Sequence, residues 1–334
     1  MATTSFGTPD SLLKATSRSF YLTLRVLPRS IRPQIGVAYL LARTTDTIAD
    51  TEVLPIAERL MALERLRNRI TGNTRGPLDF SRVTQDSKTG AAERALLERV
   101  EDALGMLARF QAADRQRISQ VLDMITSGQQ LDLERFAAAS AEHIIALASD
   151  DALDDYTYRV AGCVGEFWTK MCRAHLFPAA ELDNALLLEN GVRFGKGLQL
   201  VNILRDLLAD LHLGRCYIPE PRLAAQSLAP SDLLSAATEP RFRPLYDSYL
   251  DLAQGHLSAG WSYTNMLPRG QARLRLACAW PILIGRKTIE KLRVANILDG
   301  AHRVKVSRSE VRQIVTRSLL WYPWPRTWRR LFAG

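Results

Sequence analysis

Apolar residues recur at helical spacing along most of this 334-residue chain, whereas strand-like alternation is hard to find. One such helix follows Pro55 and precedes Thr71-Gly72, and its apolar positions are Ile56, Leu60, Leu63, Leu66 and Ile70. Further helical patterns run over about residues 91–112, 114–128, 154–174, 182–211, 241–265 and 272–295. The periodicity therefore predicts an all-α chain.

No linker interrupts these helical patterns, so we expect one all-α domain over residues 1–334. Residues 71–90 are rich in Gly, Ser, Thr, Asn and Asp, which predicts a surface loop. Residues 321–334 form a tail in which aromatic residues alternate with arginine. Such a tail is either an interfacial membrane segment or a segment docked on the protein's own surface.

The composition is that of a globular protein, with 47% hydrophobic and 24% charged residues. Lys and Arg outnumber Asp and Glu by 44 to 35, so charge alone allows nucleic acid, anionic lipid or phosphorylated small molecules as partners. No nucleic-acid-binding motif is recognisable, and such a role would leave the acidic pairs described next unexplained. We therefore expect no nucleic-acid partner.

The four cysteines show no CxxC spacing, and the five histidines are scattered singly. Neither a zinc site nor a disulfide framework is indicated. The chain shows no signal-peptide pattern and no uninterrupted run of 18 apolar residues. We expect a cytoplasmic protein that makes at most a peripheral contact with a membrane surface.

Two copies of the spacing DxxxD carry most of the chemical information: Asp46 with Asp50, and Asp206 with Asp210. On a helix, positions i and i+4 share a face with Cβ atoms about 5–6 Å apart, so each pair presents two carboxylates side by side. The two charges repel unless a cation lies between them, and Mg²⁺ prefers such oxygen ligands together with substrate phosphate. We expect a helical bundle in which the two pairs hold a diphosphate through magnesium.

Arg43 lies one helical turn before Asp46, in an otherwise apolar stretch. Its guanidinium could bind a diphosphate oxygen in a forked geometry. The alternative is a surface ion pair between Arg43 and Asp46 that stabilises the fold little.

A polar stripe leads to the second acidic pair, because Gln199, Asn202, Asp206 and Asp210 are spaced 3, 4 and 4 along an otherwise apolar helix. Such a stripe can be a solvent face. The density of Val, Ile and Leu around it favours a lined cavity instead.

Four ordered blocks resemble the squalene and phytoene synthase family, the head-to-head prenyl transferases. They are Ser17-Arg18-Ser19-Phe20, the segment YLLARTTDTIAD over 39–50, YTYRVAGCVG over 156–165, and LQLVNILRDLLAD over 198–210 followed by GRCYIP over 214–219. The resemblance implies an isoprenoid synthase fold, a helical bundle around a central cavity. It also implies that all four aspartates bind Mg²⁺ and the diphosphates of two prenyl substrates.

The resemblance further assigns roles by position. Tyr156 matches the tyrosine that takes up a proton as a cyclopropane closes. The residues implied to contact or flank the substrate or to support the metal sites are Ser19, Phe20, Tyr39, Arg43, Gln199, Asn202 and Arg205.

Two later segments resemble squalene synthases within the family: Cys278-Ala279-Trp280-Pro281 and Val304-Lys305-Val306-Ser307-Arg308. We therefore expect two farnesyl diphosphates to be joined through presqualene diphosphate and reduced by NADPH to squalene, with Lys305 and Arg308 near the cofactor phosphates. The alternative for these two residues is a solvated basic loop. Phytoene or dehydrosqualene formation is the alternative activity, and a non-catalytic helical assembly or lipid-binding factor is the alternative of another class.

Overall fold

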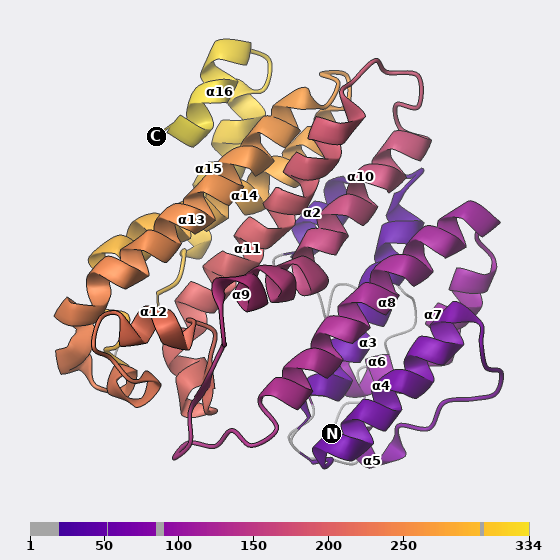
Figure 1. Cartoon of the computed structure of the whole chain (residues 1–334). Helices are drawn as coiled ribbons and strands as arrows, with labels where there is room; N and C mark the ends of the chain where they lie inside the picture. The colour runs from indigo at the N-terminus through magenta and orange to yellow at the C-terminus, as the bar shows by residue number, and fades with distance from the viewer. Residues whose placement is uncertain (1–19, 52, 85–89, 301–303, 334) are drawn as a thin grey trace. The chain divides into compact units, whose positions relative to one another are not determined.

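The computed structural model describes residues 20–51, 53–84, 90–300 and 304–333, and its regular structure is almost entirely helical (Figure 1). The prediction of an all-α fold is thereby confirmed. The chain divides into two compact units, the first formed by residues 1–134 and 170–178 and the second by residues 135–169 and 179–334. The single domain expected over 1–334 stays a prediction.

The first unit is built around one long helix, α3 (Arg32–Asp50), which contacts its neighbours in the unit on several sides. The other helices of this unit are α2 (Phe20–Val26), α4 (Ile56–Thr71), α5 (Ser81–Thr84), α6 (Ala91–Glu98), α7 (Val100–Ala108) and α8 (Ala112–Arg135). Of these, α2, α4, α6 and α7 pack against α3. Helix α3 is therefore the element that positions the first acidic pair.

Helix α3 is buried over most of its surface, and three of its buried residues are threonines. Their hydroxyls are satisfied within the helix, since Thr44 donates to the Leu40 carbonyl at 2.9 Å and Thr47 to the Arg43 carbonyl at 2.9 Å. Buried hydroxyls bonded in this way avoid the cost of unpaired polar groups. Among its apolar residues, Leu41 and Ile48 have no solvent exposure.

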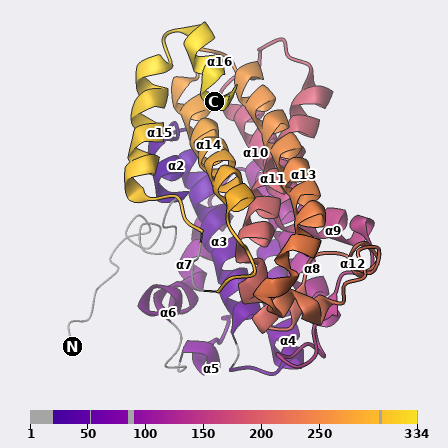
Figure 2. The ribbon, with the colours of Figure 1, turned by 90° about the vertical axis from the view of Figure 1, so that its left-hand side faces the viewer.

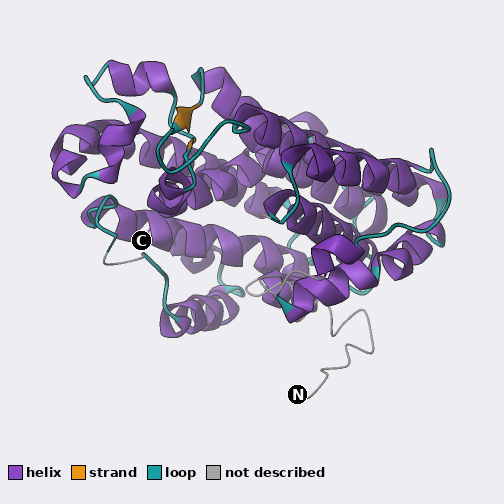
Figure 3. Ribbon diagram, turned by 90° about the horizontal axis from the view of Figure 1, so that it is seen from below, coloured by secondary structure: helices purple, strands orange, loops and turns teal. Residues whose placement is uncertain are grey.

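The second unit centres on α11 (Asn184–His212) and α13 (Glu239–Met266), which pack together along most of their length (Figure 1). The remaining elements are β1 (Ile145–Ala146), α9 (Asp150–Thr157), η1 (Tyr158–Gly162), α10 (Cys163–His175), β2 (Arg215–Cys216), α12 (Glu220–Ala224), η2 (Pro230–Leu234), η3 (Ala236–Thr238), α14 (Ala272–Val294), α15 (Arg308–Trp321) and α16 (Pro325–Ala333). The residues of α10 fall in both units. Strands β1 and β2 form a parallel pair of two residues each (Figure 3).

Glycines allow α11 to approach the segment around η1 closely. A Cβ added at Gly165 would lie 1.8 Å from the Gly191 carbonyl oxygen, and one at Gly195 would lie 2.1 Å from the Ala161 carbonyl oxygen. Both distances are far below van der Waals contact, so larger residues would push the backbones apart. Gly165 and Gly195 therefore permit this close helix approach.

Several helix boundaries differ from those predicted. Helix α4 agrees with the pattern at Ile56–Thr71, and α5 forms inside the predicted loop 71–90. The continuous helix predicted over 91–112 is wrong, because Arg99 separates α6 from α7 and α7 ends at Ala108. The pattern over 154–174 contains a π-helical turn, η1, between α9 and α10.

The tail is helical and docks on its own unit (Figure 2). Trp328 of α16 is 2% exposed and stacks on Trp261 of α13 with ring centres 5.3 Å apart. Its Nε1 donates to Asn265 Oδ1 at 3.0 Å, and Phe332 stacks on the same Trp261 ring. Of the two roles considered for the tail, docking on the protein's own surface is thus observed for this face. Among the residues described, no helix is both long enough and apolar enough to cross a membrane.

Candidate active site

The first acidic pair lies at the end of α3, where Asp50 is the last helical residue and is exposed. Arg43 lies beside the pair, with its Nη1 3.5 Å from Asp46 Oδ2 and its Nη2 3.0 Å from Glu93 Oε1. Glu93 belongs to α6 and also accepts a hydrogen bond from the Gly90 backbone. The ion pair considered as an alternative role for Arg43 is therefore present, and Glu93 orients the same guanidinium.

Gln129 of α8 is a site residue that we did not single out from the sequence. Its Nε2 donates to Asp46 Oδ1 at 2.5 Å, and the side chain is 8% exposed. Its other polar atom, Oε1, is buried and has no hydrogen-bond partner among the described residues. A buried acceptor of this kind costs stability unless a ligand or water satisfies it.

The carboxyl of Asp46 is perturbed by its surroundings. Burial among protein atoms and the charge of Asp50 raise its pKa to about 6, and Arg43 and Gln129 only partly oppose this shift. The Asp46 side chain is still 44% exposed. Asp46 is therefore enclosed by protein but accessible to a solute, the setting in which a cation can replace a proton.

These groups fit a magnesium site. Two carboxylates and one unsatisfied amide oxygen are hard ligands, or acceptors for metal-bound water, of the kind Mg²⁺ uses. Within the described parts of the chain, no three His, Cys, Asp or Glu side chains form a ready metal cluster. The remaining ligands would therefore be water and substrate oxygens, as is usual for Mg²⁺.

For the other predicted site residues of the first unit, the structure gives positions along the helices. Tyr39 lies one turn before Arg43 on α3 and is half-buried. Phe20 is the first residue of α2. Ser19 lies outside the described residues.

In the second unit, α11 carries the predicted polar stripe on a partly exposed face. Leu200, Ile203 and Leu207 between the stripe positions are buried. Asn202 is exposed, and the other three stripe residues, Gln199, Asp206 and Asp210, are half-buried. The helix thus packs its apolar side inward and leaves amides and acids accessible in a row.

Arg205 pairs with its sequence neighbour Asp206, with Nε 3.1 Å from Oδ1. The Asp206 side chain is 22% exposed. This contact places a cation beside the second acidic pair, as Arg43 does beside the first. A diphosphate-binding role for Arg43 and Arg205 stays a prediction.

Tyr156 of α9 stacks on Tyr217, which follows β2, with ring centres 4.9 Å apart. The Tyr156 hydroxyl donates to the Tyr217 hydroxyl at 3.4 Å, and both residues are buried. Phe136 packs its edge against Tyr217 at 5.4 Å. The two phenols form a linked pair in an aromatic setting, and Tyr217 is a second site residue that we did not single out from the sequence.

Helix α11, which carries Asp206 and Asp210, packs against β2, and the last residue of β2, Cys216, precedes Tyr217. Burial raises the pKa of the Cys216 thiol to about 12, and the charge of Asp210 adds to the increase.

Arg308 is the first residue of α15 and Lys305 lies three residues before it, and both are exposed. The Lys305 carbonyl accepts a hydrogen bond from Lys291 of α14 at 3.0 Å. Ser307 caps α15 by accepting from the Glu310 backbone at 3.2 Å. A cofactor role for Lys305 and Arg308 stays a prediction.

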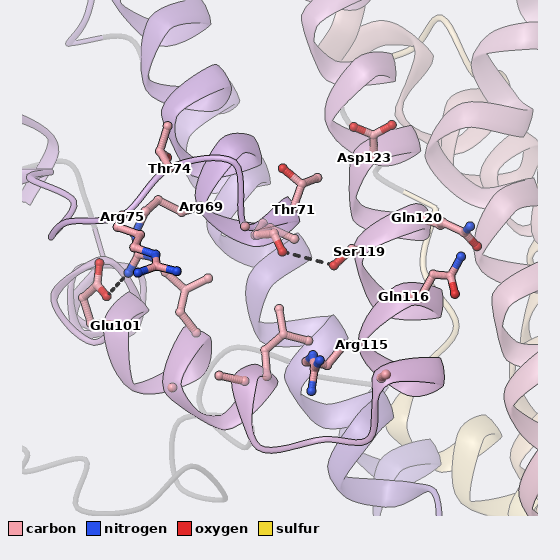
Figure 4. Close-up of a pocket in the computed structure, with 17 residues that line it drawn as sticks. Arg69, Thr71, Thr74, Arg75, Glu101, Arg115, Gln116, Ser119, Gln120 and Asp123 are labelled. Carbon is pink, nitrogen blue, oxygen red and sulfur yellow. Dashed lines mark hydrogen bonds and ion pairs between the residues drawn. The ribbon is translucent and has the colours of Figure 1, made fainter.

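A pocket of about 980 Å³ in the first unit is lined by the end of α4, by α7 and by the start of α8 (Figure 4). None of the predicted site residues lines it. Two of the three arginines that line it have partners, since Arg69 pairs with Glu101 at 2.6 Å and Arg115 donates to the Phe110 carbonyl at 2.7 Å. We do not place the active site there.

The family described as Squalene/phytoene synthase matches residues 13–310. A bifunctional lycopene cyclase/phytoene synthase of Blakeslea trispora is 29% identical over 63% of this chain and 32% of its own length. The presqualene diphosphate synthase of Zymomonas mobilis is 28% identical over 78% of this chain and 76% of its own length. This chain spans about a third to a half of the bifunctional relatives.

Among solved structures, a ligand complex of TcSQS superposes with a TM-score of 0.74. It is 21% identical and covers 93% of this chain and 85% of its own. At that identity the likeness establishes the fold, which is the isoprenoid synthase fold expected from the sequence.

Proposed function

Because this chain belongs to the squalene/phytoene synthase family, we propose that it joins two molecules of farnesyl diphosphate head to head to form presqualene diphosphate and then squalene. The family relationship supports a prenyltransferase that acts on prenyl diphosphates. The proposal for squalene rests on the segments 278–281 and 304–308, which resemble squalene synthases.

The arrangement around Asp46 is the observation that carries the proposal. A carboxyl whose pKa is raised to about 6, a second carboxyl one turn away and a buried unsatisfied amide oxygen form a site that a divalent cation completes. Bound Mg²⁺ would neutralise the leaving diphosphate and so favour its departure. Asp206 and Asp210 supply the corresponding pair in the second unit.

The residues of this chain have separate tasks in such a reaction. Arg43 is held by Glu93 at 3.0 Å, so its guanidinium is oriented before substrate binds and can contact a diphosphate oxygen. Arg205 has the same task beside Asp206. After the allylic diphosphate ionises, the double bond of the second substrate attacks the carbocation, and loss of one proton closes the cyclopropane.

Tyr156 and Tyr217 are arranged to take up that proton. When the Tyr156 oxygen accepts a proton from the substrate, its own hydroxyl proton can pass to Tyr217, 3.4 Å away, and the hydroxyl proton of Tyr217 must then pass to an oxygen of the diphosphate that the reaction released. The proton ends on that diphosphate, so neither buried phenol keeps a charge. NADPH would supply the hydride for the later reduction, with Lys305 and Arg308 as proposed contacts for its phosphates.

A second candidate is an enzyme that stops at presqualene diphosphate. It is favoured by the relatives named presqualene diphosphate synthases in Zymomonas mobilis and Rhodopseudomonas palustris, which match 78% and 76% of this chain. Phytoene or dehydrosqualene formation would use the same metal and tyrosine residues with another product. These activities differ in substrate length and in their response to NADPH.

A non-catalytic assembly protein or lipid-binding factor would be expected to tolerate loss of the aspartates. The test is the double variant Asp46→Asn with Asp50→Asn, compared with Asp123→Asn, which removes a carboxylate that pairs with Arg67 and lines the pocket of about 980 Å³. We expect the double variant to lose product formation from farnesyl diphosphate and the control to keep it. A double variant that retains full turnover would remove the proposed metal site.

A further inference from the structure

The pocket of about 980 Å³ lined by α4, α7 and α8 contains none of the residues assigned to the proposed reaction, and its lining carries excess positive charge. Its charged residues are three arginines and two acids: Arg69, Arg75, Arg115, Glu101 and Asp123. Both acids have partners of their own. Glu101 pairs with Arg69 at 2.6 Å, and Asp123 pairs at 2.5 Å with an arginine outside the lining, Arg67. The excess charge therefore lies on Arg75 and Arg115.

No acid neutralises Arg75 or Arg115 in the described parts of the chain. Arg75 is exposed just after α4 and forms no ion pair or hydrogen bond with the residues described. Arg115 is exposed near the start of α8 and donates to the Phe110 carbonyl at 2.7 Å, which is a neutral acceptor. The third arginine, Arg69, has a buried Nε without a hydrogen-bond partner among the described residues. A buried donor of this kind costs stability unless a ligand or water satisfies it.

The end of α4, which also lines the pocket, has hydrogen-bonded carbonyl groups. The Ile70 carbonyl accepts from Ser119 Oγ of α8 at 3.1 Å, and the Arg69 carbonyl accepts from the Gly72 backbone at 3.3 Å. Unpaired carbonyls at a helix C-terminus would present partial negative charge and oppose an anion. Because these two are paired, the arginines determine the charge that a ligand meets.

The pocket also has an apolar side and more room than an inorganic anion needs. Ile70, Leu104 and Leu107 line it, and we call these three residues the apolar wall. Gly105 of α7 faces open space, because a Cβ added to it would meet nothing within 4 Å. Protein pockets for drug-sized organic ligands hold about 300–1,000 Å³, and this one, at about 980 Å³, is at the upper end of that range. A ligand that fits therefore has an organic body as well as negative charge.

We propose that this pocket binds an organic diphosphate ester, with its diphosphate on Arg75 and Arg115 and its organic body on the apolar wall. In Figure 4, Arg69 and Arg75 lie on one side of the pocket, and Arg115 comes from the start of α8. Guanidinium groups bind phosphate oxygens through paired hydrogen bonds, so two unneutralised arginines favour a diphosphate over a single carboxylate. Nucleoside diphosphates and prenyl diphosphates share this chemistry. The site is separate from the acidic pairs and needs no metal ion.

Isothermal titration calorimetry of the whole protein, in EDTA and low salt, tests the site with three probes: inorganic diphosphate, ADP and farnesyl diphosphate. EDTA removes the Mg²⁺ that the acidic pairs would need to hold a diphosphate. We expect one of the two esters to bind more tightly than inorganic diphosphate by about tenfold or more, because its body buries apolar surface. Salt should weaken this binding. The tighter ester identifies the source of the diphosphate.

Two variants probe the two parts of the site. Arg75→Gln should weaken binding of that ester by about tenfold or more, because it removes a charged donor. The matched control is Arg65→Gln, which neutralises an exposed arginine of α4 that does not line the pocket and should not change binding. Gly105→Leu fills the room beside the apolar wall and should weaken the ester more than inorganic diphosphate. Leucine favours a helix over glycine, and circular dichroism of every variant should show an intact helical fold.

The candidate active site is tested separately by Arg43→Gln with Arg205→Gln, a variant that should keep the ester binding. Equal binding by Arg75→Gln and Arg65→Gln would overturn the proposal. So would an absence of ester binding, inorganic diphosphate that binds as tightly as both esters, or loss of the binding in the variant of Arg43 and Arg205.

Discussion

Competition between a proton and a magnesium ion at Asp46 offers a quantitative prediction. With a pKa of about 6, this carboxyl is about half ionised at pH ~6 and about one-tenth ionised at pH ~5. An aspartate at the ordinary value of 3.8 would still be more than about nine-tenths ionised at pH ~5. If Mg²⁺ binds only the ionised form, a concentration about ten times its Kd should lower the titration midpoint by about one pH unit.

Carbon-13 NMR of aspartate-labelled protein measures this midpoint, and Asp46→Asn identifies the signal. Asp50→Asn should lower the midpoint without metal, because it removes the neighbouring negative charge. Asp123→Asn should leave the midpoint unchanged. A midpoint in the ordinary aspartate range, or one that Mg²⁺ does not move, would refute the reasoning.

The raised pKa of Asp46 also determines the direction in which the stability of the folded protein changes with pH. Because the folded-state pKa of Asp46 is raised, the folded state binds more protons than the unfolded chain between about pH 4 and pH 6. The contribution of Asp46 to the stability of the metal-free protein is therefore lost as pH rises through about 6. Mg²⁺ should raise the melting temperature more above that pH than below it.

Three substitutions probe the packing and the proton step. Gly165→Ala should lower the free energy of unfolding by about 1–3 kcal/mol, because the added Cβ would lie 1.8 Å from a backbone carbonyl oxygen. The control Gly105→Ala, which has nothing within 4 Å of the added Cβ, should not lower it. Denaturant titration compares the two variants. Trp328→Ala should cost about 3–5 kcal/mol in the same assay because the side chain is 2% exposed, and Trp324→Ala, at 61% exposed, should cost less than about 0.5 kcal/mol. Tyr156→Phe should keep prenyl diphosphate binding but lose about 10²-fold or more in turnover, measured as product formed per unit time; unchanged turnover would exclude its role as proton acceptor.

The sequence predicted the elements that depend on local spacing. Both acidic pairs lie on long helices, α3 and α11. On a helix, a spacing of four residues places the two side chains of each pair on one face, as predicted. The burial of residues between the stripe positions of α11 follows the same periodicity.

Features that depend on distant partners were not predicted. Gln129 meets Asp46 across 83 residues, and Tyr217 meets Tyr156 across 61, so no local spacing signals either contact. The π-helical turn at Tyr158–Gly162 was also not predicted from the helical pattern over 154–174. The two roles of the tail could not be separated because the stacking partner of Trp328 lies on α13.

The most direct test of the proposed activity is mass-spectrometric product analysis after purified protein is incubated with Mg²⁺ and farnesyl diphosphate, with and without NADPH, and with geranylgeranyl diphosphate as a competing substrate. We predict presqualene diphosphate without NADPH and squalene with it. Presqualene diphosphate under both conditions would indicate the second candidate, whereas dehydrosqualene or a C40 product would contradict the proposal for squalene. An absence of any prenyl product would contradict the assignment of the aspartates to catalysis.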